Sequence, residues 1–270
     1  KRQLKYHEKL IIEEVEIFLA PAGHVLGSAQ VVMNFTNQVI TVSGDYKRQD
    51  DPTCAAFEPI KSDIFITEAT FALPVFKHPN ANTQINLLIK SIQNFPERCH
   101  VIGVYSLGKA QRLIKMLRNN GWHNTIYLHG SLVKICNLYE KFGIDLGDLE
   151  PATIQDKPEK PHDFYKGKLI LAPPSALADR WSRRFPDPIL GMASGWMTVK
   201  QRAKQRGINL PLILSDHADW NEILTTIKEV SPKEVWITHG AEEALIYECS
   251  KNNLTAKALS IIGYESDTDL

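Results

Sequence analysis

The chain has 270 residues, of which 43% are hydrophobic and 23% are charged, a composition typical of a globular protein with one large or two smaller domains. Its formal net charge is zero, which excludes a global field that attracts polyanions, and no apolar run approaches the ~20 residues that span a bilayer. The four cysteines are scattered and form no CxxC pair, which indicates reduced thiols. We therefore expect a cytoplasmic protein that does not bind membranes.

Short apolar segments bounded by turn residues predict strands at residues 16–19, 31–35, 39–42 and 63–67. Two strand–helix pairs follow, at 100–105 with 109–118 and at 125–128 with 132–142. Further strands are predicted at 169–171, 188–193, 212–214 and 234–238, and further helices at 221–230 and 242–252. This alternation predicts an α/β or mixed α+β architecture. The polar, proline-rich stretch 145–166 predicts a surface loop.

Five of the predicted strands lead into a residue that can bind a metal or move a proton, namely His24, Asp45, Glu68, His217 and His239. Ligands of α/β sheets gather outside the carboxyl ends of strands, and imidazole with carboxylate is the ligand set of zinc. Each residue alone also has an ordinary explanation, such as a turn at Asp45 or a helix cap at Glu68. Spacing alone leaves both interpretations open.

The segments around these residues resemble, in this order, the motifs of β-CASP nucleases of the metallo-β-lactamase superfamily. They are residues 22–29, 43–45, 67–70, 215–219 and 238–240. The resemblance implies that His24 binds zinc, that Asp45 bridges two zinc ions and that His239 completes the second zinc site. It also implies that Glu68 supports catalysis and that His217 acts at the scissile phosphate, held by Glu68 or by its own neighbours.

Two acids lie close to His217 in the sequence, Asp216 and Asp219. Asp216 and Asp219 are candidates for carboxylates that fix an imidazole tautomer, and we include Asp216 among the catalytic residues. Asp219 has an ordinary alternative as the cap of the helix that starts near Trp220.

Six further segments resemble the bacterial subgroup called DNA ligase-associated exonucleases, at residues 44–47, 51–54, 57–59, 107–112, 171–175 and 193–196. The resemblance covers residues from about 15 to 255. It implies a metallo-β-lactamase αββα sandwich, with its N-terminal strands absent, and an inserted α/β β-CASP domain. The expected boundaries are 1–70 and 208–270 for the metallo-β-lactamase domain and 71–207 for the insert.

One motif of the superfamily, His-x-His-x-Asp-His, occurs nowhere in the chain. In the family it precedes the third metal motif, so we expect it upstream of Lys1, which is not a methionine. The motif supplies four of the ligands that hold two zinc ions in the intact protein. With only His24, Asp45 and His239 of the expected set, this chain should hold two zinc ions poorly.

A basic stretch between Arg180 and Arg206 contains seven Lys or Arg residues and one acid, with tryptophans interleaved. Such a pattern suits contact with a nucleic-acid backbone and stacking on bases, although a solvated helix face is the ordinary alternative. In the context of the resemblance, the helix that Lys109 opens faces the substrate groove, and its N-terminus could take a phosphate. The expected substrate-binding residues are Lys109, Arg112, Ser175, Arg183, Arg184, Trp196 and Arg202.

The expected function is zinc-dependent hydrolysis of phosphodiesters by a DNA exonuclease of DNA repair. The expected partners are single-stranded or end-containing DNA, with an ATP-dependent DNA ligase and a helicase as functional neighbours. Alternatives are an RNA-processing β-CASP nuclease, a small-molecule hydrolase such as a lactamase, and a metal-poor, non-catalytic fragment that binds nucleic acid. Hydrolysis of a lactam without nuclease activity would identify the small-molecule hydrolase, and a strong preference for RNA would identify the RNA nuclease.

Overall fold

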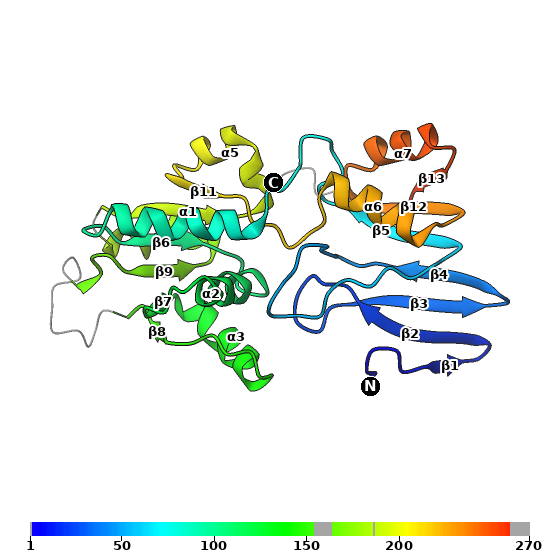
Figure 1. Cartoon of the computed structure of the whole chain (residues 1–270), viewed down its shortest axis with the longest axis horizontal. Coiled ribbons are helices and arrows are strands. Elements are labelled where there is room, and N and C mark those ends of the chain that lie inside the picture. The colour runs from blue at the N-terminus through cyan, green and yellow to red at the C-terminus, as the bar shows by residue number, and fades with distance from the viewer. Residues whose placement is uncertain (1, 154–163, 186, 260–270) are drawn as a thin grey trace.

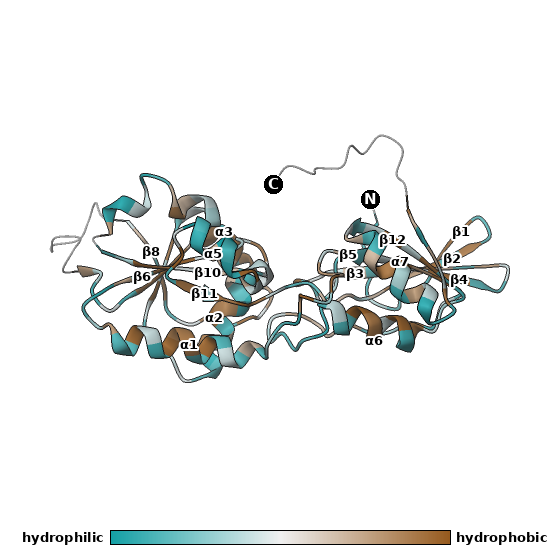
Figure 2. Cartoon of the chain, turned by 90° about the horizontal axis from the view of Figure 1, so that it is seen from above, coloured by the Kyte–Doolittle hydropathy of each residue, from teal (hydrophilic) through white to brown (hydrophobic). Residues whose placement is uncertain are grey.

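The computed structural model describes residues 2–153, 164–185 and 187–259. Within these residues the chain forms a mixed α/β structure with two separate sheets (Figure 1). Seen from above, the sheets form two lobes that several chain segments connect (Figure 2). One lobe combines segments from the beginning and the end of the chain, and the other is built from the middle.

The first lobe contains a seven-stranded sheet among the described residues, in the order β1-β2-β3-β4-β5-β12-β13. Strands β1 to β4 are antiparallel neighbours, whereas β4, β5, β12 and β13 run parallel. Its elements are β1 (Leu10–Ile12), β2 (Val15–Pro21), β3 (Ala29–Phe35), β4 (Gln38–Val42), β5 (Ile64–Ala69), α6 (Trp220–Val230), β12 (Glu234–Gly240), α7 (Glu242–Lys251) and β13 (Thr255–Ala258). The pairing of β12 with β5 places two distant parts of the chain at one sheet edge.

The core of this lobe explains why β12 joins β5. Phe65 on β5 and Val235 and Ile237 on β12 are fully buried, and Ile223 of α6 and Leu245 of α7 belong to the same cluster. Burying apolar surface is the main favourable term in folding, so these strands pair where α6 and α7 can cover them. The register sets Thr238 opposite Glu68, with a bulge before Gly240.

The second lobe contains a six-stranded sheet of parallel strands, in the order β11-β10-β6-β9-β7-β8. Its strands are β6 (His100–Gly103), β7 (Ile126–Leu128), β8 (Leu149–Pro151), β9 (Leu169–Ala172), β10 (Ile189–Ala193) and β11 (Leu210–Leu212). The helices are α1 (Ala81–Asn94), α2 (Lys109–Asn119), α3 (Gly130–Lys141), α5 (Lys200–Gln205) and the 3₁₀ turns η1 (Pro174–Leu177), η2 (Ser182–Arg184) and η3 (Gly195–Thr198). Because the strands are parallel, the loops that follow them share one edge of the sheet.

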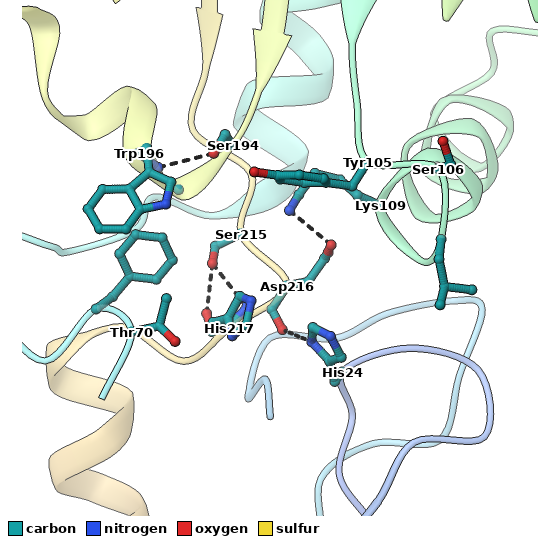
Figure 3. A pocket seen from close by; sticks show the side chains of 13 residues that line it. His24, Thr70, Tyr105, Ser106, Lys109, Ser194, Trp196, Ser215, Asp216 and His217 are labelled. Atoms are coloured by element: carbon teal, nitrogen blue, oxygen red, sulfur yellow. Dashed lines mark hydrogen bonds and ion pairs between the residues drawn. The ribbon is translucent and has the colours of Figure 1, made fainter. Parts of the chain in front are cut away.

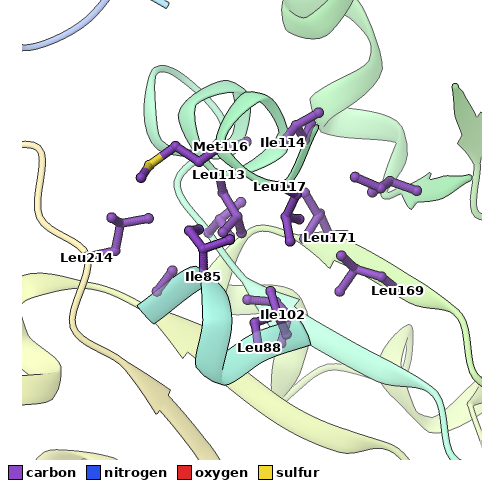
Figure 4. Close-up of a cluster of buried hydrophobic side chains, with 14 of the residues drawn as sticks. Ile85, Leu88, Ile102, Leu113, Ile114, Met116, Leu117, Leu169, Leu171 and Leu214 are labelled. Carbon is purple, nitrogen blue, oxygen red and sulfur yellow. The ribbon is translucent and has the colours of Figure 1, made fainter. Parts of the chain in front are cut away.

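The core of the second lobe lies between this sheet and helices α1 and α2 (Figure 4). Ile85 and Leu88 of α1 and Leu113 of α2 are fully buried against Ile102 and Leu171 of the sheet. The apolar positions of α1 recur at helical spacing, and the Asn80 side chain caps its first turn. This packing fixes the orientation of α2 and therefore the position of the residues at its first turn.

The structure differs from the sequence-based expectation at several elements. Helix α1 and strands β1, β8 and β13 were not anticipated, and β8 lies inside the stretch 145–166 that was expected to be a loop; residues 154–163 of that stretch lie outside the described residues. Strand β11 covers Leu210–Leu212 rather than 212–214, so the segment before His217 is a loop. Strand β11 also lies beyond residue 207, the expected end of the inserted domain, and yet it pairs with β10 in the second sheet.

The sequence predicted reduced cysteines and no membrane-spanning segment. All four cysteines are unpaired in the structure. Among the described residues, the helices are too short or too polar to span a bilayer.

Candidate metal and nuclease site

A cavity of about 350 Å³ lies between the two lobes, where the carboxyl edge of the parallel sheet faces the His24 loop (Figure 3). The loops after β5, β6, β10 and β11 line it, together with the loop that carries His24. The position outside the carboxyl ends of parallel strands is the general place for ligands in α/β sheets.

Three possible metal ligands lie close together, His24 and His217 at the cavity wall and Asp45 beside them, and their ligand atoms all lie within 4.8 Å of one another. The Nδ1 atom of His24 lies 2.8 Å from the backbone oxygen of Asp216. A carbonyl oxygen only accepts hydrogen bonds, so this Nδ1 carries the proton and the Nε2 atom has a free lone pair. Nε2 lies 3.8 Å from Oδ2 of Asp45, so both atoms are available to one cation.

Two glycines allow the His24 and Asp45 loops to approach each other. Gly23 has a φ of +72°, and a Cβ atom there would lie 2.5 Å from the carbonyl oxygen of Lys47. Gly44, before Asp45, also has a positive φ, +57°. Left-handed backbone and close approach both favour glycine, so these positions tolerate no larger residue without strain. The Ser28 hydroxyl then accepts hydrogen bonds from the amides of His24 and Val25, which fixes the loop.

His217 is held by Glu68, one of the two possibilities that the sequence left open. Nδ1 of His217 donates to Oε2 of Glu68 at 2.9 Å, which leaves Nε2 facing the cavity. Glu68 is almost fully buried and also accepts from the amide of Tyr46 and the hydroxyl of Thr70. Burial disfavours the charged imidazole, but the hydrogen bond and the charge of Glu68 outweigh it and raise the pKa of His217.

Asp216 contributes to the site in a different way from the one expected. Its backbone oxygen, not its carboxylate, orients the His24 imidazole. The carboxylate is buried and lies 2.9 Å from Nζ of Lys109 and 3.6 Å from the guanidinium of Arg112. Burial alone would raise the pKa of Asp216, but the cations Lys109, Lys47 and Arg112 lower it to about 2. The carboxylate is therefore an ionised structural partner and not a proton carrier.

Arg112, expected to bind substrate, is fully buried with a side-chain exposure of 0%. Its guanidinium donates to the carbonyl oxygens of Ser215 and Asp50 and lies 3.7 Å from the carboxylate of Asp51. A side chain with no exposed surface cannot contact a substrate, so this prediction was wrong. Arg112 instead connects helix α2 with the loops that carry Asp45 and His217.

The start of helix α2 was expected to be able to bind a phosphate. The first amides are already satisfied within the chain, because Gly108 donates to the Gln111 side chain and Ala110 to the oxygen of Tyr105. Lys109 lines the cavity, but its side chain is only 5% exposed and is paired with Asp216. The positive charge of Lys109 therefore acts on the cavity, whereas the helix end has no free amide at these positions.

The remaining expected substrate residues divide into two groups. Trp196 lines the cavity, and the Arg202 guanidinium stacks over its ring at 4.1 Å from the centroid. Ser175 and Arg183 are exposed on η1 and η2 and do not line the cavity. Arg184, also on η2, stacks on Trp181 at 5.1 Å.

His239 does not join the metal cluster among the described residues. It is exposed, with a φ of +64°, at the bulge where β12 passes the end of β5. The third residue of the metal cluster, beside His24 and Asp45, is His217. Asp219, the second acid near His217, caps helix α6 through the amide of Glu222, in line with its ordinary explanation.

Sequence reasoning missed several residues of the cavity wall, above all Tyr105, Leu107 and Phe71. Phe71 follows β5 and Tyr105 follows β6, so the carboxyl-end rule that singled out Glu68 applied to them as well. They were overlooked because the rule was applied only to groups that bind metals or protons.

The donors present fit a metal ion of the zinc type. Nε2 of His24 and the carboxylate of Asp45 are donors of the kind that catalytic zinc sites use, with the His24 tautomer fixed by the Asp216 carbonyl, and His217 lies beside them. A metal held by His24 and Asp45 would polarise a phosphate oxygen and lower the pKa of a bound water. The described residues gather three ligand atoms here, a set for one ion rather than two.

The mixed α/β architecture fits a fold of the metallo-β-lactamase type, and His24, Asp45 and His217 could hold a metal ion. A domain family described as the Zn-dependent metallo-hydrolase RNA specificity domain matches residues 211–250. A "Probable DNA ligase" of Opitutus terrae is 26% identical over 90% of this chain and 23% of its own length. The cleavage and polyadenylation specificity factor 73 of Drosophila melanogaster is 32% identical over 49% of this chain and 21% of its own length.

These similarities agree with the resemblance of the sequence motifs to β-CASP nucleases of the metallo-β-lactamase superfamily. The chain spans about a quarter or less of the length of these two relatives. A crystal structure of a protein of unknown function from Enterococcus faecalis V583 superposes with a TM-score of 0.62 at 13% identity, covering 97% of this chain and 66% of that one. At this identity the likeness concerns the fold alone.

Proposed function

We propose that the chain is part of a metal-dependent nuclease that hydrolyses phosphodiesters of DNA from an end. The observation that carries the proposal is the arrangement of His24 and His217. Both imidazoles donate Nδ1–H to a fixed acceptor and line one cavity, and the carboxylate of Asp45 lies close to both rings. The positively charged Lys109 and several aromatic side chains line the same cavity, which suits a nucleic-acid strand with its phosphates and bases.

The chain's own residues have separate roles in this proposal. His24 and Asp45 would hold the metal, which would activate water and stabilise the phosphate oxygens. His217 donates a proton from Nε2 to the leaving oxygen, and Glu68 keeps its imidazole oriented and stabilises the charged form. Lys109, fixed by Asp216, provides positive potential for the phosphate.

DNA as the substrate is supported by the resemblance to ligase-associated exonucleases and by the ligase name of the Opitutus terrae relative. The full protein would then hold two zinc ions, prefer single-stranded or end-containing DNA, and act beside a ligase and a helicase in DNA repair. A second candidate is an RNA-processing nuclease. The family description matched at residues 211–250 names RNA specificity, and the Drosophila relative is named as a cleavage and polyadenylation factor.

The test compares three substrates of one base sequence with and without added zinc, namely linear single-stranded DNA, closed circular single-stranded DNA and linear RNA. The proposal expects hydrolysis of the linear DNA that stops when the metal is chelated, and little cleavage of the circle. Equal rates on the circle and the linear strand would disprove action from an end. A strong preference for RNA would establish the second candidate.

A further inference from the structure

Tyr105 occupies an unusual position at the rim of the cavity. Its side chain is 50% exposed and that of Leu107 is 54% exposed, and both residues line the cavity together with His24 and His217. Figure 3 shows Tyr105 and Trp196 on two sides of the cavity, with Ser215 and His217 between and below them. Single exposed apolar side chains are common, so exposure alone assigns no role to this tyrosine.

The contact that Tyr105 makes with Lys109 distinguishes it from an ordinary surface tyrosine. Nζ of Lys109 lies 5.0 Å from the centroid of the Tyr105 ring and 2.9 Å from the Asp216 carboxylate. The ion pair fixes the ammonium, so one side of the ring faces a positioned cation. Lys109 is buried, whereas Tyr105 is half exposed and lines the cavity. Part of the aromatic ring is therefore accessible to a ligand at the cavity.

Trp196, which with Trp181 was a stacking candidate in the sequence, already packs against other side chains. Arg202 covers its ring at 4.1 Å, and the rings of Phe71 and Phe76 lie 4.8 Å and 5.2 Å from it. A base stacking on the face that Arg202 covers would have to displace the guanidinium. Trp196 therefore forms a packed wall of the cavity, and Tyr105 is the more accessible of the two rings.

We propose that Tyr105 is the stacking platform for an unpaired nucleobase next to the phosphate that enters the His24–His217 cavity. The proposal rests on the proposed function and specifies how the substrate is recognised. A nucleobase offers a π-face of any sequence, the ring of Tyr105 accepts it, and Leu107 extends the apolar rim. A base inside a duplex is stacked between its neighbours and presents no free face. This platform therefore selects single strands or frayed ends.

The test measures the dissociation constant of the 270-residue chain for a short fluorescein-labelled single-stranded DNA by fluorescence anisotropy, in EDTA so that no hydrolysis occurs. Tyr105→Ala should weaken binding about 5- to 150-fold, which corresponds to the ~1–3 kcal/mol of a stacked base. Tyr105→Phe should bind within about threefold of the wild type, because the ring and not the hydroxyl makes the contact. The melting temperatures of both variants establish that the fold is kept.

The chain contains a matched control in Tyr247 and Lys251 on α7. There too a lysine four residues after a tyrosine lies over the ring, at 5.8 Å, and Tyr247 is 67% exposed, but neither residue lines the cavity. Tyr247→Ala should leave the dissociation constant unchanged. An equal loss from Tyr247→Ala and Tyr105→Ala would show a general surface effect and overturn the proposal.

A set of oligonucleotides, each with one abasic site at a different position, locates the stacked base. When the abasic site replaces the stacked base, the wild type and Tyr105→Ala should have the same dissociation constant. When it lies at another position, Tyr105→Ala should still bind more weakly than the wild type. If Tyr105→Ala binds the single strand with the same dissociation constant as the wild type, the stacking role is overturned, even where hydrolysis is intact. Binding that depends on Tyr105 without metal-dependent hydrolysis supports the stacking role and contradicts the proposed nuclease function.

Discussion

Nδ1 of His217 lies 2.9 Å from Oε2 of Glu68, although the two residues are 149 positions apart in the chain. Glu68 is the penultimate residue of strand β5 of the mixed sheet, and His217 follows strand β11 of the parallel sheet. The pair therefore connects the two lobes at the cavity. Its geometry leaves Nε2 of His217 toward His24 and Asp45, the arrangement that a proton donor beside a metal site requires.

The first prediction concerns this pair. Glu68→Gln should lower the turnover of the metal-loaded nuclease about 10- to 100-fold, the range for loss of a partner that orients a functional imidazole. A glutamine amide cannot accept from His217, Tyr46 and Thr70 at once as the carboxylate does. Steady-state kinetics should show the loss in kcat rather than in KM. An unchanged kcat would exclude a functional role for the contact.

The second prediction separates metal binding from proton transfer. Asp45→Ala should lower the zinc content and the activity together, because it removes a ligand. His217→Ala should keep most of the zinc and lower hydrolysis by about 10²–10⁴, as for loss of a general acid. Elemental analysis of both variants, with exposed Asp50→Ala as a control, provides the comparison. If His217→Ala loses as much zinc as Asp45→Ala, then His217 is a metal ligand.

The third prediction concerns Arg112. Arg112→Met should lower the free energy of unfolding by about 2–4 kcal/mol, because buried acceptors and carboxylates lose their donor. Ser215 and Asp50 lose the guanidinium that their carbonyl oxygens accept from. Arg183→Met on the exposed 3₁₀ turn should change stability by less than about 0.5 kcal/mol. Urea unfolding of the two variants tests the difference, and equal stabilities would contradict the structural role of Arg112.

The fourth prediction concerns the basic residues outside the cavity. If Arg183, Arg184 and Arg202 neutralise phosphates, their replacement by alanine should weaken DNA binding and flatten its dependence on salt, by about 0.7 in slope for each lost contact with a single strand. Binding constants across a series of salt concentrations give the slope. Arg98→Ala is a suitable control, since Arg98 pairs with Asp187 at the amino end of the parallel sheet. A slope equal to that of the wild type would mark the three arginines as a solvated surface.

The fifth prediction concerns pH and His100, which is fully buried in the second lobe and bonded to Ser91. Burial lowers the pKa of His100 to about 4. The unfolded chain takes up this proton near pH 6.5 and the folded chain only near pH 4, so stability should fall as the pH decreases through this window. His100→Gln should flatten the decrease by up to about 3 kcal/mol, measured by urea unfolding. Exposed His123→Gln should leave it unchanged.

The sequence alone determined the elements whose patterns are local. Strands β2 to β5 and β12 and helices α2, α3 and α6 were predicted close to their observed bounds, because apolar period and turn residues are properties of neighbouring residues. The strand-end positions of His24, Asp45 and Glu68 followed from the same patterns, and the resemblance to β-CASP nucleases followed from the motifs around them.

The tertiary structure alone decided which of these residues meet. The burial of Arg112 and the place of Tyr105 at the rim depend on how α2 packs in the second lobe and against the loops of the first. The choice of Glu68 as the partner of His217 depends on the order of strands in two sheets, as does the separation of His239 from the metal cluster. Local periodicity shows that a side chain follows a strand. It does not show which strand end lies opposite, because burial of the two cores sets that arrangement.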